Sequence, residues 1–239
     1  MLEVAFHSDR ENRGSLYLDA QRMRGLTHLV PSVISVIHRS RPDRDRVQRF
    51  IEETYARCYG SVISRHYPML MSVEDGDGRI VAAVGLRAAA EETLFLEQYL
   101  SEPVELSLCK ATGARVERET IFEIGNLAAS GKGASVFLFV TLAAYLRQRE
   151  GVYAVVTATD VLRNVFDFLR FNPLELGKAD PHVLPDDGIS WGNYYERDPK
   201  VLAGAIAPCF ARLERYLPAH CNTDLGRLFA HIYTSEAAG

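Results

Sequence analysis

The sequence predicts an α/β fold of the mixed α+β kind, in which a mixed central sheet is flanked by helices and followed by a helical C-terminal segment. Apolar runs bounded by turn residues alternate with stretches of three- and four-residue apolar spacing, which mark strands and amphipathic helices respectively. In the second half of the chain the order is strand, glycine-rich turn, helix, strand, helix, strand. That order favours parallel neighbouring strands joined by helical crossovers.

The expected elements of the first half are a strand, a turn, an amphipathic helix, a hairpin and a short helix or loop, at residues 2–6, 8–13, 47–62, 69–88 and 94–100. The helix follows Pro42 and Asp43, which favour a helix start. The hairpin is expected because two apolar runs flank a Gly/Asp turn at 74–78.

The expected elements of the second half are strand, helix, strand, helix, strand and helix, at residues 116–128, 134–149, 153–158, 161–169, 174–177 and from 201 onward. The helix over 134–149 is apolar nearly all round, so it should be buried. We expect one domain over residues 1–200, with a helical extension over 201–239 packed on it.

Composition and charge exclude several classes of protein. The 239 residues are 47% apolar and 24% charged, as in soluble globular proteins. A net charge of −4 argues against nucleic-acid binding, and the arginine-rich stretch 39–49 also carries Asp43 and Asp45, which favours a solvated loop and helix start. No apolar run approaches the ~20 residues of a membrane span.

The N-terminus and the cysteines suggest a cytoplasmic protein. The first ten residues lack the basic region and apolar core of a signal peptide. The four cysteines, at positions 58, 109, 209 and 221, have neither C-x-x-C nor zinc-ligand spacing. We therefore expect free thiols, no bound metal and no stable membrane insertion.

The sharpest local feature is the stretch 121–134, a strand that runs into a glycine-rich turn and then a helix. Backbone N–H groups at such a junction attract phosphate, and glycine lets the backbone approach an anion closely. It is not a Walker A loop, because Gly125 and Gly131 are one residue too far apart and Gly133 stands where Ser or Thr should follow Lys132. The alternative is a tight turn without ligand. The expected thioester-binding residues are Ala128, Ser130, Gly131, Lys132, Gly133, Ala134, Ser135 and Thr159.

A candidate reaction centre precedes this turn. Glu123 lies two residues before Gly125, where a carboxylate can act as general base beside a bound acyl thioester. A distortion at Gly125 and Asn126 would aim the backbone N–H groups of Asn126 and Leu127 at the thioester carbonyl. The structural alternative is that Glu123 ties down the strand by accepting backbone N–H bonds.

Residues 116–180 resemble the cofactor-binding half of the Gcn5-related N-acetyltransferase superfamily. They are similar in particular to the acyl-homoserine-lactone synthases, whose Glu-containing central strand reads much like residues 123–128. The resemblance implies an acyltransferase-like fold that binds the pantetheine and pyrophosphate of an acyl thioester, with CoA or an acyl carrier protein as its carrier.

One departure from that pattern concerns the leaving group. The superfamily often places a general-acid Tyr five residues before the Phe of a Gly-Phe pair. Here Phe166 stands in place of that Tyr, and Arg170 stands in place of Gly before Phe171. The departure puts simple acetyl-CoA chemistry in doubt, and it leaves a carrier-protein thioester or a different leaving-group acid open.

A second resemblance covers most of the chain. The chain is identified as a member of the thermostable hemolysin family on five segments: Phe50-Ile51 with Tyr55 and Tyr59, then 82–88, 94–100, 123–128 and 191–195. The family name implies lysis of blood cells. These residues do not explain such an activity.

Further residues are candidates for binding the acceptor. Arg87 and Glu97 can point into one cleft and recognise an amine or a carboxylate, the alternative being a structural ion pair. Tyr99 follows on the same segment as Glu97. Trp191, Tyr194 and Tyr195 can line an acceptor or acyl pocket, because aromatic side chains offer wide apolar area with polar tips. Their alternative role is core packing.

These observations favour an enzyme that transfers an acyl group from a CoA or carrier-protein thioester to a small amine-type acceptor. Its partners would be the small-molecule acceptor and, for a carrier-bound donor, an acyl carrier protein. Two other roles stay open, a membrane-lytic hemolysin and a non-catalytic ligand-binding protein of the same fold.

Overall fold

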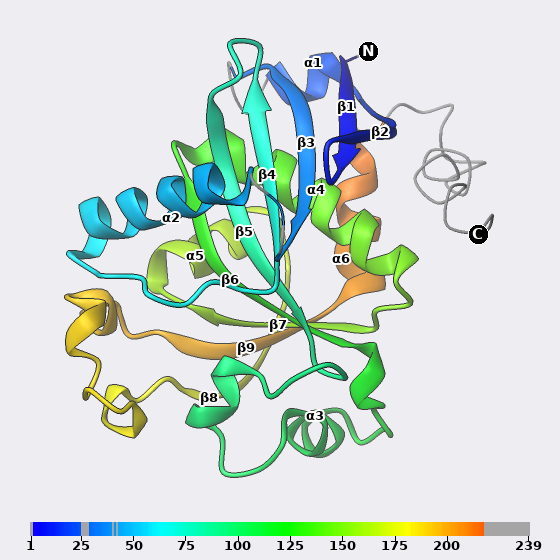
Figure 1. Cartoon of the computed structure of the whole chain (residues 1–239). Helices are drawn as coiled ribbons and strands as arrows, with labels where there is room; N and C mark the ends of the chain where they lie inside the picture. The colour runs from blue at the N-terminus through cyan, green and yellow to red at the C-terminus, as the bar shows by residue number, and fades with distance from the viewer. Residues whose placement is uncertain (1, 25–28, 40, 42, 218–239) are drawn as a thin grey trace.

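The computed structural model describes residues 2–24, 29–39, 41 and 43–217, apart from the side chains of Asn12, Arg13 and Lys132. Within this part the strands form one mixed sheet in the order β2-β1-β3-β4-β5-β6-β7-β9-β8 (Figure 1). Their bounds are β1 Leu2–Ser8, β2 Glu11–Leu18, β3 Pro31–His38, β4 Met69–Asp75, β5 Ile80–Ala88, β6 Ile121–Ala129, β7 Tyr153–Ala158, β8 Leu174–Lys178 and β9 Lys200–Ala205.

Helices cover both faces of the sheet. The α-helices are α1 Ala20–Arg24, α2 Arg44–Tyr59, α3 Val104–Thr112, α4 Lys132–Gln148, α5 Asp160–Phe168 and α6 Ile206–Leu213. Short 3₁₀ helices are η1 Phe95–Tyr99, η2 Arg118–Thr120, η3 Pro181–Val183, η4 Ile189–Trp191, η5 Tyr194–Arg197 and η6 Glu214–Tyr216.

Alternate residues of β5 show which helix covers which face. Ala83 belongs to a core built with α2, whereas Ala82 and Val84 belong to the core built with α4 and α6. Successive side chains of a strand point to opposite faces, so α2 lies on one face and α4 with α6 on the other. A third core lies beneath η1 and α3, on the face that α2 covers elsewhere.

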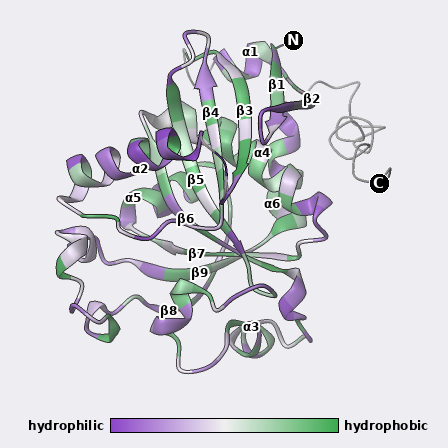
Figure 2. Cartoon of the chain, in the orientation of Figure 1, coloured by the Kyte–Doolittle hydropathy of each residue, from purple (hydrophilic) through white to green (hydrophobic). Residues whose placement is uncertain are grey.

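The apolar helix α4 is buried, as its composition predicts. Its residues from Ala134 to Leu146 are all buried, and Figure 2 shows it among hydrophobic segments of the interior. No helix in the described part of the chain combines the length and the apolar character needed to cross a membrane. The hydrophobicity of α4 is therefore accounted for by packing between the sheet and α6.

The predicted strand–turn–helix–strand unit is confirmed as β6, α4 and β7, with β6 and β7 parallel. Their pairing runs from Ile121 opposite Tyr153 to Ile124 opposite Val156 and then stops. Strand β6 nevertheless continues to Ala129 and β7 to Ala158. The two strands therefore separate beyond Ile124, and the opening between them is called the splay below.

The expectation of a helix from Val201 onward was wrong at its start. Residues 200–205 form β9, and the helix begins only at Ile206. The boundary expected at 200/201 therefore falls inside a strand, and β9 lies between β7 and β8, which are not neighbours. A short apolar run that is buried on both faces has the same sequence pattern in a strand as in a helix, which explains the error. Residues 218–239 of the expected extension lie outside the described residues.

Two other features were not foreseen. Strands β2 and β3 and helices α1 and α3 had no sequence-based expectation. The arginine-rich stretch is not wholly solvated, because Arg44 is buried and donates to the carbonyl oxygens of Tyr67 and Pro68.

Cys58, Cys109 and Cys209 are free thiols, and Cys221 lies outside the described part.

Candidate active site

The expected distortion of β6 is present as a β-bulge. Between Ala83 and Gly85 of β5 the register shifts, so that Asn126 and Leu127 share one partner position on β5. Asn126 has a φ of 51°, in the left-handed region that Asn tolerates better than most residues. Its side chain is buried and donates to the carbonyl oxygen of Arg65 at 3.4 Å. The bulge lies on the part of β6 that borders the splay.

Glu123 is buried beside this bulge, with 1% of its side chain exposed. Its Oε2 accepts the N–H of Phe95 and its Oε1 the N–H of Leu96, both at 2.9 Å, so it caps the start of η1. Burial raises the pKa of Glu123 above its usual range, against the opposing effect of these donors, of Arg87 and of the Tyr67 hydroxyl. The carboxylate thus ties β6 to η1 and has raised basicity as well.

Arg87 lies opposite Glu123 on β5, with its Nη1 3.6 Å from Oε2 of Glu123. The same Nη1 donates to the carbonyl oxygen of Thr93 at 3.1 Å. The buried Nε has no hydrogen-bond partner among the described residues, and it forms an ion pair with Glu92 at 3.7 Å.

Tyr67 was missed by the sequence analysis. Its ring lies across β5 and β6 where Gly85 and Gly125 pair with each other. A Cβ on Gly85 would come within 2.6 Å of the ring's Cγ, and one on Gly125 within 2.1 Å of its hydroxyl oxygen. Glycine inside a strand often marks such a close approach, which is the signal that could have revealed it.

The turn between β6 and α4 has the expected shape. Ser130 donates its N–H and its hydroxyl to the carbonyl oxygen of Val81, which fixes the start of the turn. Gly131, the N-cap residue of α4, is exposed and extended and has no side chain with which to cap the helix. Gly133, Ala134 and Ser135 form the buried first turn of α4, whereas the side chain of Lys132 lies outside the described part of the structure. Ala128 is buried in β6 against the α2 face.

The end of β7 forms the other side of the splay. Thr159 is the N-cap residue of α5 and lies beside the Tyr59 hydroxyl, whose pKa burial raises. Tyr194 donates its hydroxyl to the carbonyl oxygen of Thr157 at 3.1 Å. Aromatic residues from α2 and η5 therefore lie directly over this end of β7.

The four aromatic residues expected at the acceptor site lie in one cluster. The hydroxyl oxygens of Tyr99 and Tyr195 are 2.6 Å apart, and the Trp191 ring packs tilted against Tyr194 and edge-on against Tyr195. Phe95 joins the cluster through Tyr99 and Trp191, and its N–H is one of the two that Glu123 accepts. Burial raises the pKa of Tyr195 to about 12, so its hydroxyl stays protonated.

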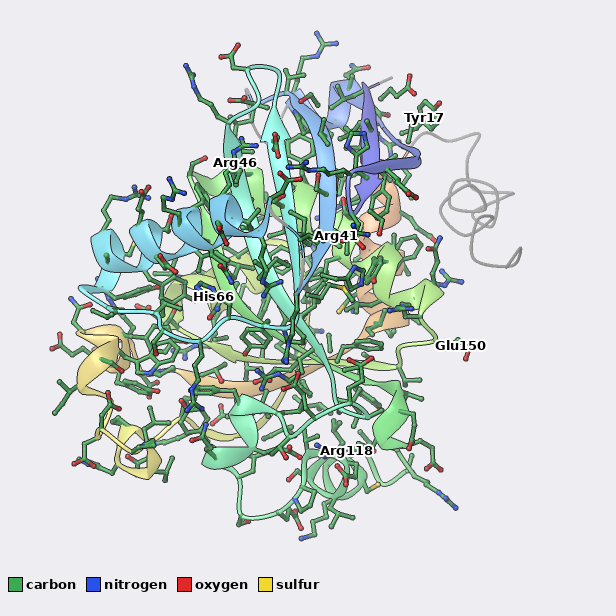
Figure 3. All side chains as sticks on the ribbon, in the orientation of Figure 1. Tyr17, Arg41, Arg46, His66, Arg118 and Glu150 are labelled. Atoms are coloured by element: carbon green, nitrogen blue, oxygen red, sulfur yellow. The ribbon has the colours of Figure 1, made fainter. Side chains whose placement is uncertain are left out.

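Glu97 does not pair with Arg87 within the described contacts. It accepts two N–H groups of Arg118 and the backbone N–H groups of Leu94 and Val104. Burial opposes its ionisation, but these hydrogen bonds hold the pKa of Glu97 below its usual range. Figure 3 shows Arg118 beside α3. The carboxylate of Glu97 therefore connects η1 to α3.

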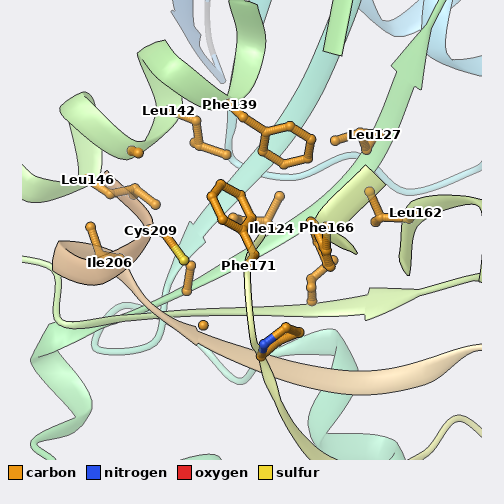
Figure 4. Close-up of a pocket in the computed structure, with 15 residues that line it drawn as sticks. Ile124, Leu127, Phe139, Leu142, Leu146, Leu162, Phe166, Phe171, Ile206 and Cys209 are labelled. Carbon is orange, nitrogen blue, oxygen red and sulfur yellow. The ribbon is translucent and has the colours of Figure 1, made fainter. Parts of the chain in front are cut away.

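An apolar cavity of about 70 Å³ opens on the α4 side of the splay (Figure 4). It is lined by Ile124 and Leu127 of β6, by residues of β7, α4, α5 and α6, and by Gly204 of β9. Phe166 packs edge-on against Phe139 and tilted against Phe171 in its wall, so at position 166 α5 presents a phenyl ring and not a hydroxyl. Arg170, in the place of the usual Gly, has a φ of 59°.

The described side chains include no group of three or more His, Cys, Asp or Glu that could hold a metal ion. The arrangement combines features that suit acyl transfer. A bulged strand, a buried carboxylate and a helix N-terminus border an opening in the sheet, with an apolar cavity beneath it.

Solved structures share this fold. The acyl-homoserine-lactone synthase LasI aligns with a TM-score of 0.54 at 12% identity, covering 78% of this chain and 96% of that one. The apo form of TofI aligns with a TM-score of 0.51 at 13% identity, covering 78% and 98%. FeeM, an N-acyl amino acid synthase from uncultured soil microbes, aligns with a TM-score of 0.50 at 14% identity, covering 76% and 99%. At such identities the likeness shows the fold alone.

The sequence itself points to one family. A comparison with curated proteins found no significant match. The sequence model of the thermostable hemolysin family matches residues 37–210, which include α2, the bulged strand, the turn and the aromatic cluster. The match spans well over half of the chain, and the chain belongs to the thermostable hemolysin family.

Proposed function

We propose that this protein is an acyltransferase that moves an acyl group from a CoA or carrier-protein thioester to a small amine. The observation that carries the proposal is the splay between β6 and β7, with the bulge at Asn126 on one border and the apolar cavity beneath it. A thioester carbonyl placed at the bulge would meet backbone N–H groups of Asn126 and Leu127, which stabilise the developing oxyanion. Its acyl chain would enter the cavity.

The donor is proposed to bind along the splay by its phosphopantetheine arm. The phosphate would meet the N-terminus of α4, where the exposed Gly131 leads into the helix and the helix dipole favours an anion. Thr159 faces the same opening from the start of α5. CoA and a carrier protein present the same arm, so both remain substrates of the proposal. Free thiols at Cys58, Cys109 and Cys209 agree with work in the reducing cytoplasm.

The acceptor is proposed to bind on the α2 face, beside Glu123. The guanidinium of Arg87, whose buried Nε has no hydrogen-bond partner among the described residues, suits a carboxylate. The cluster of Tyr99, Trp191, Tyr194 and Tyr195 suits an apolar side chain. Together these features favour an amino acid as the amine-type acceptor. FeeM, which has this fold, is an N-acyl amino acid synthase. Glu97 is proposed to contribute to the acceptor site only by holding η1 in place.

Glu123 is proposed as the base of the site. Its raised pKa suits it to accept a proton, and its bonds to η1 hold it in place. A lytic role, which the family name implies, would need an element that enters lipid. The apolar helix α4 is buried in the core and is not available for that purpose without unfolding.

The proposal is tested by product formation. The protein is mixed with acetyl-, octanoyl- or palmitoyl-CoA, or with an octanoyl carrier protein, and with a mixture of L-amino acids and simple primary amines. Mass spectrometry should find an N-acyl product together with the free thiol. Absence of product with every one of these donors would contradict the proposal.

A charge variant tests the donor site in the same assay. Gly133→Asp introduces a negative charge into the first turn of α4, where it would repel the bound phosphate. We expect CoA binding to weaken by at least tenfold, measured by calorimetry. Gly133→Asn has nearly the same shape without the charge, and it should retain most of the affinity. Equal affinities in the two variants would place the phosphate elsewhere.

A further inference from the structure

Glu123 has no direct route to an acceptor amine. Its side chain is 1% exposed, and each carboxylate oxygen already accepts one backbone N–H group. A base buried in this way needs an intermediate group to carry the proton. The Tyr67 hydroxyl is a candidate for such a group, because it lies against Gly125, two residues from Glu123 on β6, and it influences the pKa of Glu123.

Tyr67 is fixed by contacts at both ends. Its carbonyl oxygen and that of Pro68 accept from the buried guanidinium of Arg44. Its ring lies between the paired glycines Gly85 and Gly125 on one side and the guanidinium of Arg87 on the other, 4.8 Å from the ring centroid.

The ring is also directed toward the splay. Its Cβ end is nearest Gly85 of β5 and its hydroxyl end is nearest Gly125 of β6. Strand β6 is the one that borders the splay, and Gly125 directly precedes the bulged residue Asn126. The hydroxyl is thus held between the carboxylate and the place proposed for the thioester carbonyl.

We infer that Tyr67 is a catalytic residue, whose hydroxyl accepts the proton lost by the acceptor amine while passing its own hydrogen to Glu123. This inference rests on the proposed acyl transfer. The protonation states agree with it, because burial raises the pKa of Tyr67 well above that of an ordinary phenol and raises that of Glu123 as well. Tyr67 stays neutral, and Glu123 is a stronger base than a solvated glutamate.

The step balances without a further reactant. The amine nitrogen bonds to the carbonyl carbon, and its proton moves to the Tyr67 oxygen as the phenolic hydrogen moves to Glu123. The C–S bond then breaks, and the proton returns through the same hydroxyl to the sulfur, which leaves as the thiol. Tyr67 thereby supplies the leaving-group acid that α5 lacks, where Phe166 lies in the cavity wall.

The test is Tyr67→Phe, which keeps the ring in its slot and removes the hydroxyl. With octanoyl-CoA and the amino-acid mixture, we expect the single-turnover rate to fall by about 10²-fold or more, with calorimetric CoA affinity unchanged. The fall in rate at acid pH that comes from protonating Glu123 should also disappear, since the carboxylate is no longer connected to the amine. The matched control is Tyr145→Phe, which removes another buried hydroxyl, one that donates to the sulfur of Met69, and should stay within about twofold of the parent.

A second measurement needs no variant. If two protons move together, the parent's single-turnover rate should fall in D₂O and curve downward with deuterium fraction. The proton transfer through Tyr67 would be overturned by either of two results, and the proposed acyl transfer would still stand. One is a Tyr67→Phe variant whose single-turnover rate and whose fall in rate at acid pH are both unchanged. The other is the absence of a solvent isotope effect in the parent. No transfer by the parent would overturn the proposed function and the relay with it.

Discussion

Two glycines that face each other across β5 and β6 decide where Tyr67 can lie. Gly85 and Gly125 are paired in register, and neither has a positive φ. Their role is therefore to leave room, since a Cβ at either site would overlap the Tyr67 ring. The absence of two methyl groups thus sets the position of a hydroxyl beside Glu123.

Gly125→Ala tests this packing directly. The added Cβ would lie 2.1 Å from the Tyr67 oxygen, so the ring must leave its slot or the strands must shift. We expect a loss of about 1–3 kcal/mol in the free energy of unfolding, measured by denaturant titration. Gly76→Ala is the control, because a Cβ there meets nothing within 4 Å, and it should change stability little. Equal stability of the two variants would contradict the close approach of Tyr67.

At the scale of elements, two carboxylates hold η1 in place. Glu123 accepts the N–H groups of Phe95 and Leu96, whereas Glu97 accepts that of Leu94 and also reaches Val104 at the start of α3. Arg118 joins Glu97 to Glu105, with 26% of its side chain exposed. The wall that carries Phe95 and Tyr99 is therefore fixed from both sides.

Removing Arg118 should loosen this wall. Arg118→Ala leaves Glu97 partly buried without its main partner, and we expect a loss of about 2–3 kcal/mol at neutral pH, less than for a fully buried pair. Because the pKa of Glu97 is depressed, its contribution is present above the unfolded value of about 4.3 and is lost as the pH falls through the folded value. The stability difference between parent and variant should therefore shrink at acid pH.

The control for this experiment is Arg115→Ala, which removes an arginine whose side chain is 85% exposed, and it should cost less than about 0.5 kcal/mol. Denaturant titrations at neutral and acid pH measure both variants. A loss that stays constant with pH would show that the ion pair with Glu97 does not stabilise η1.

The sequence predicts those parts of the structure whose signals lie close together along the chain. The unit β6–turn–α4–β7 was predicted because its signals lie within some forty residues. A distortion was expected at Gly125 and Asn126, and Asn126 adopts the left-handed conformation in the bulge. Strand β9 was missed because Val201 to Ala203 are buried on both faces and show no alternation.

Contacts between distant segments could not be predicted in this way. Nothing near Tyr67 in sequence indicates that it reaches Gly125, and nothing near Glu97 indicates Arg118 as its partner. The sequence did predict that Tyr99, Trp191, Tyr194 and Tyr195 would serve one region, and they lie in one cluster. Their role in binding an acceptor stays a prediction.

At the scale of the whole molecule, the sheet separates two sets of side chains. Glu123, Arg87 and Tyr67 lie on the face of α2, whereas Ile124 and the apolar cavity lie on the face of α4. The splay lies between β6 and β7, beyond Ile124. On the proposed function, the acceptor comes from the first face, the acyl chain occupies the second, and the thioester carbonyl lies between them.

The most direct test of this arrangement compares the calorimetric affinities of CoA and octanoyl-CoA in the parent and in Ala143→Leu, which fills the cavity from α4. Burial of a few methylenes should favour octanoyl-CoA by on the order of 2 kcal/mol in the parent, about thirtyfold in affinity. In Ala143→Leu that preference should be lost while CoA affinity is kept. Equal affinities of CoA and octanoyl-CoA in the parent, or a preference that survives in Ala143→Leu, would contradict the account.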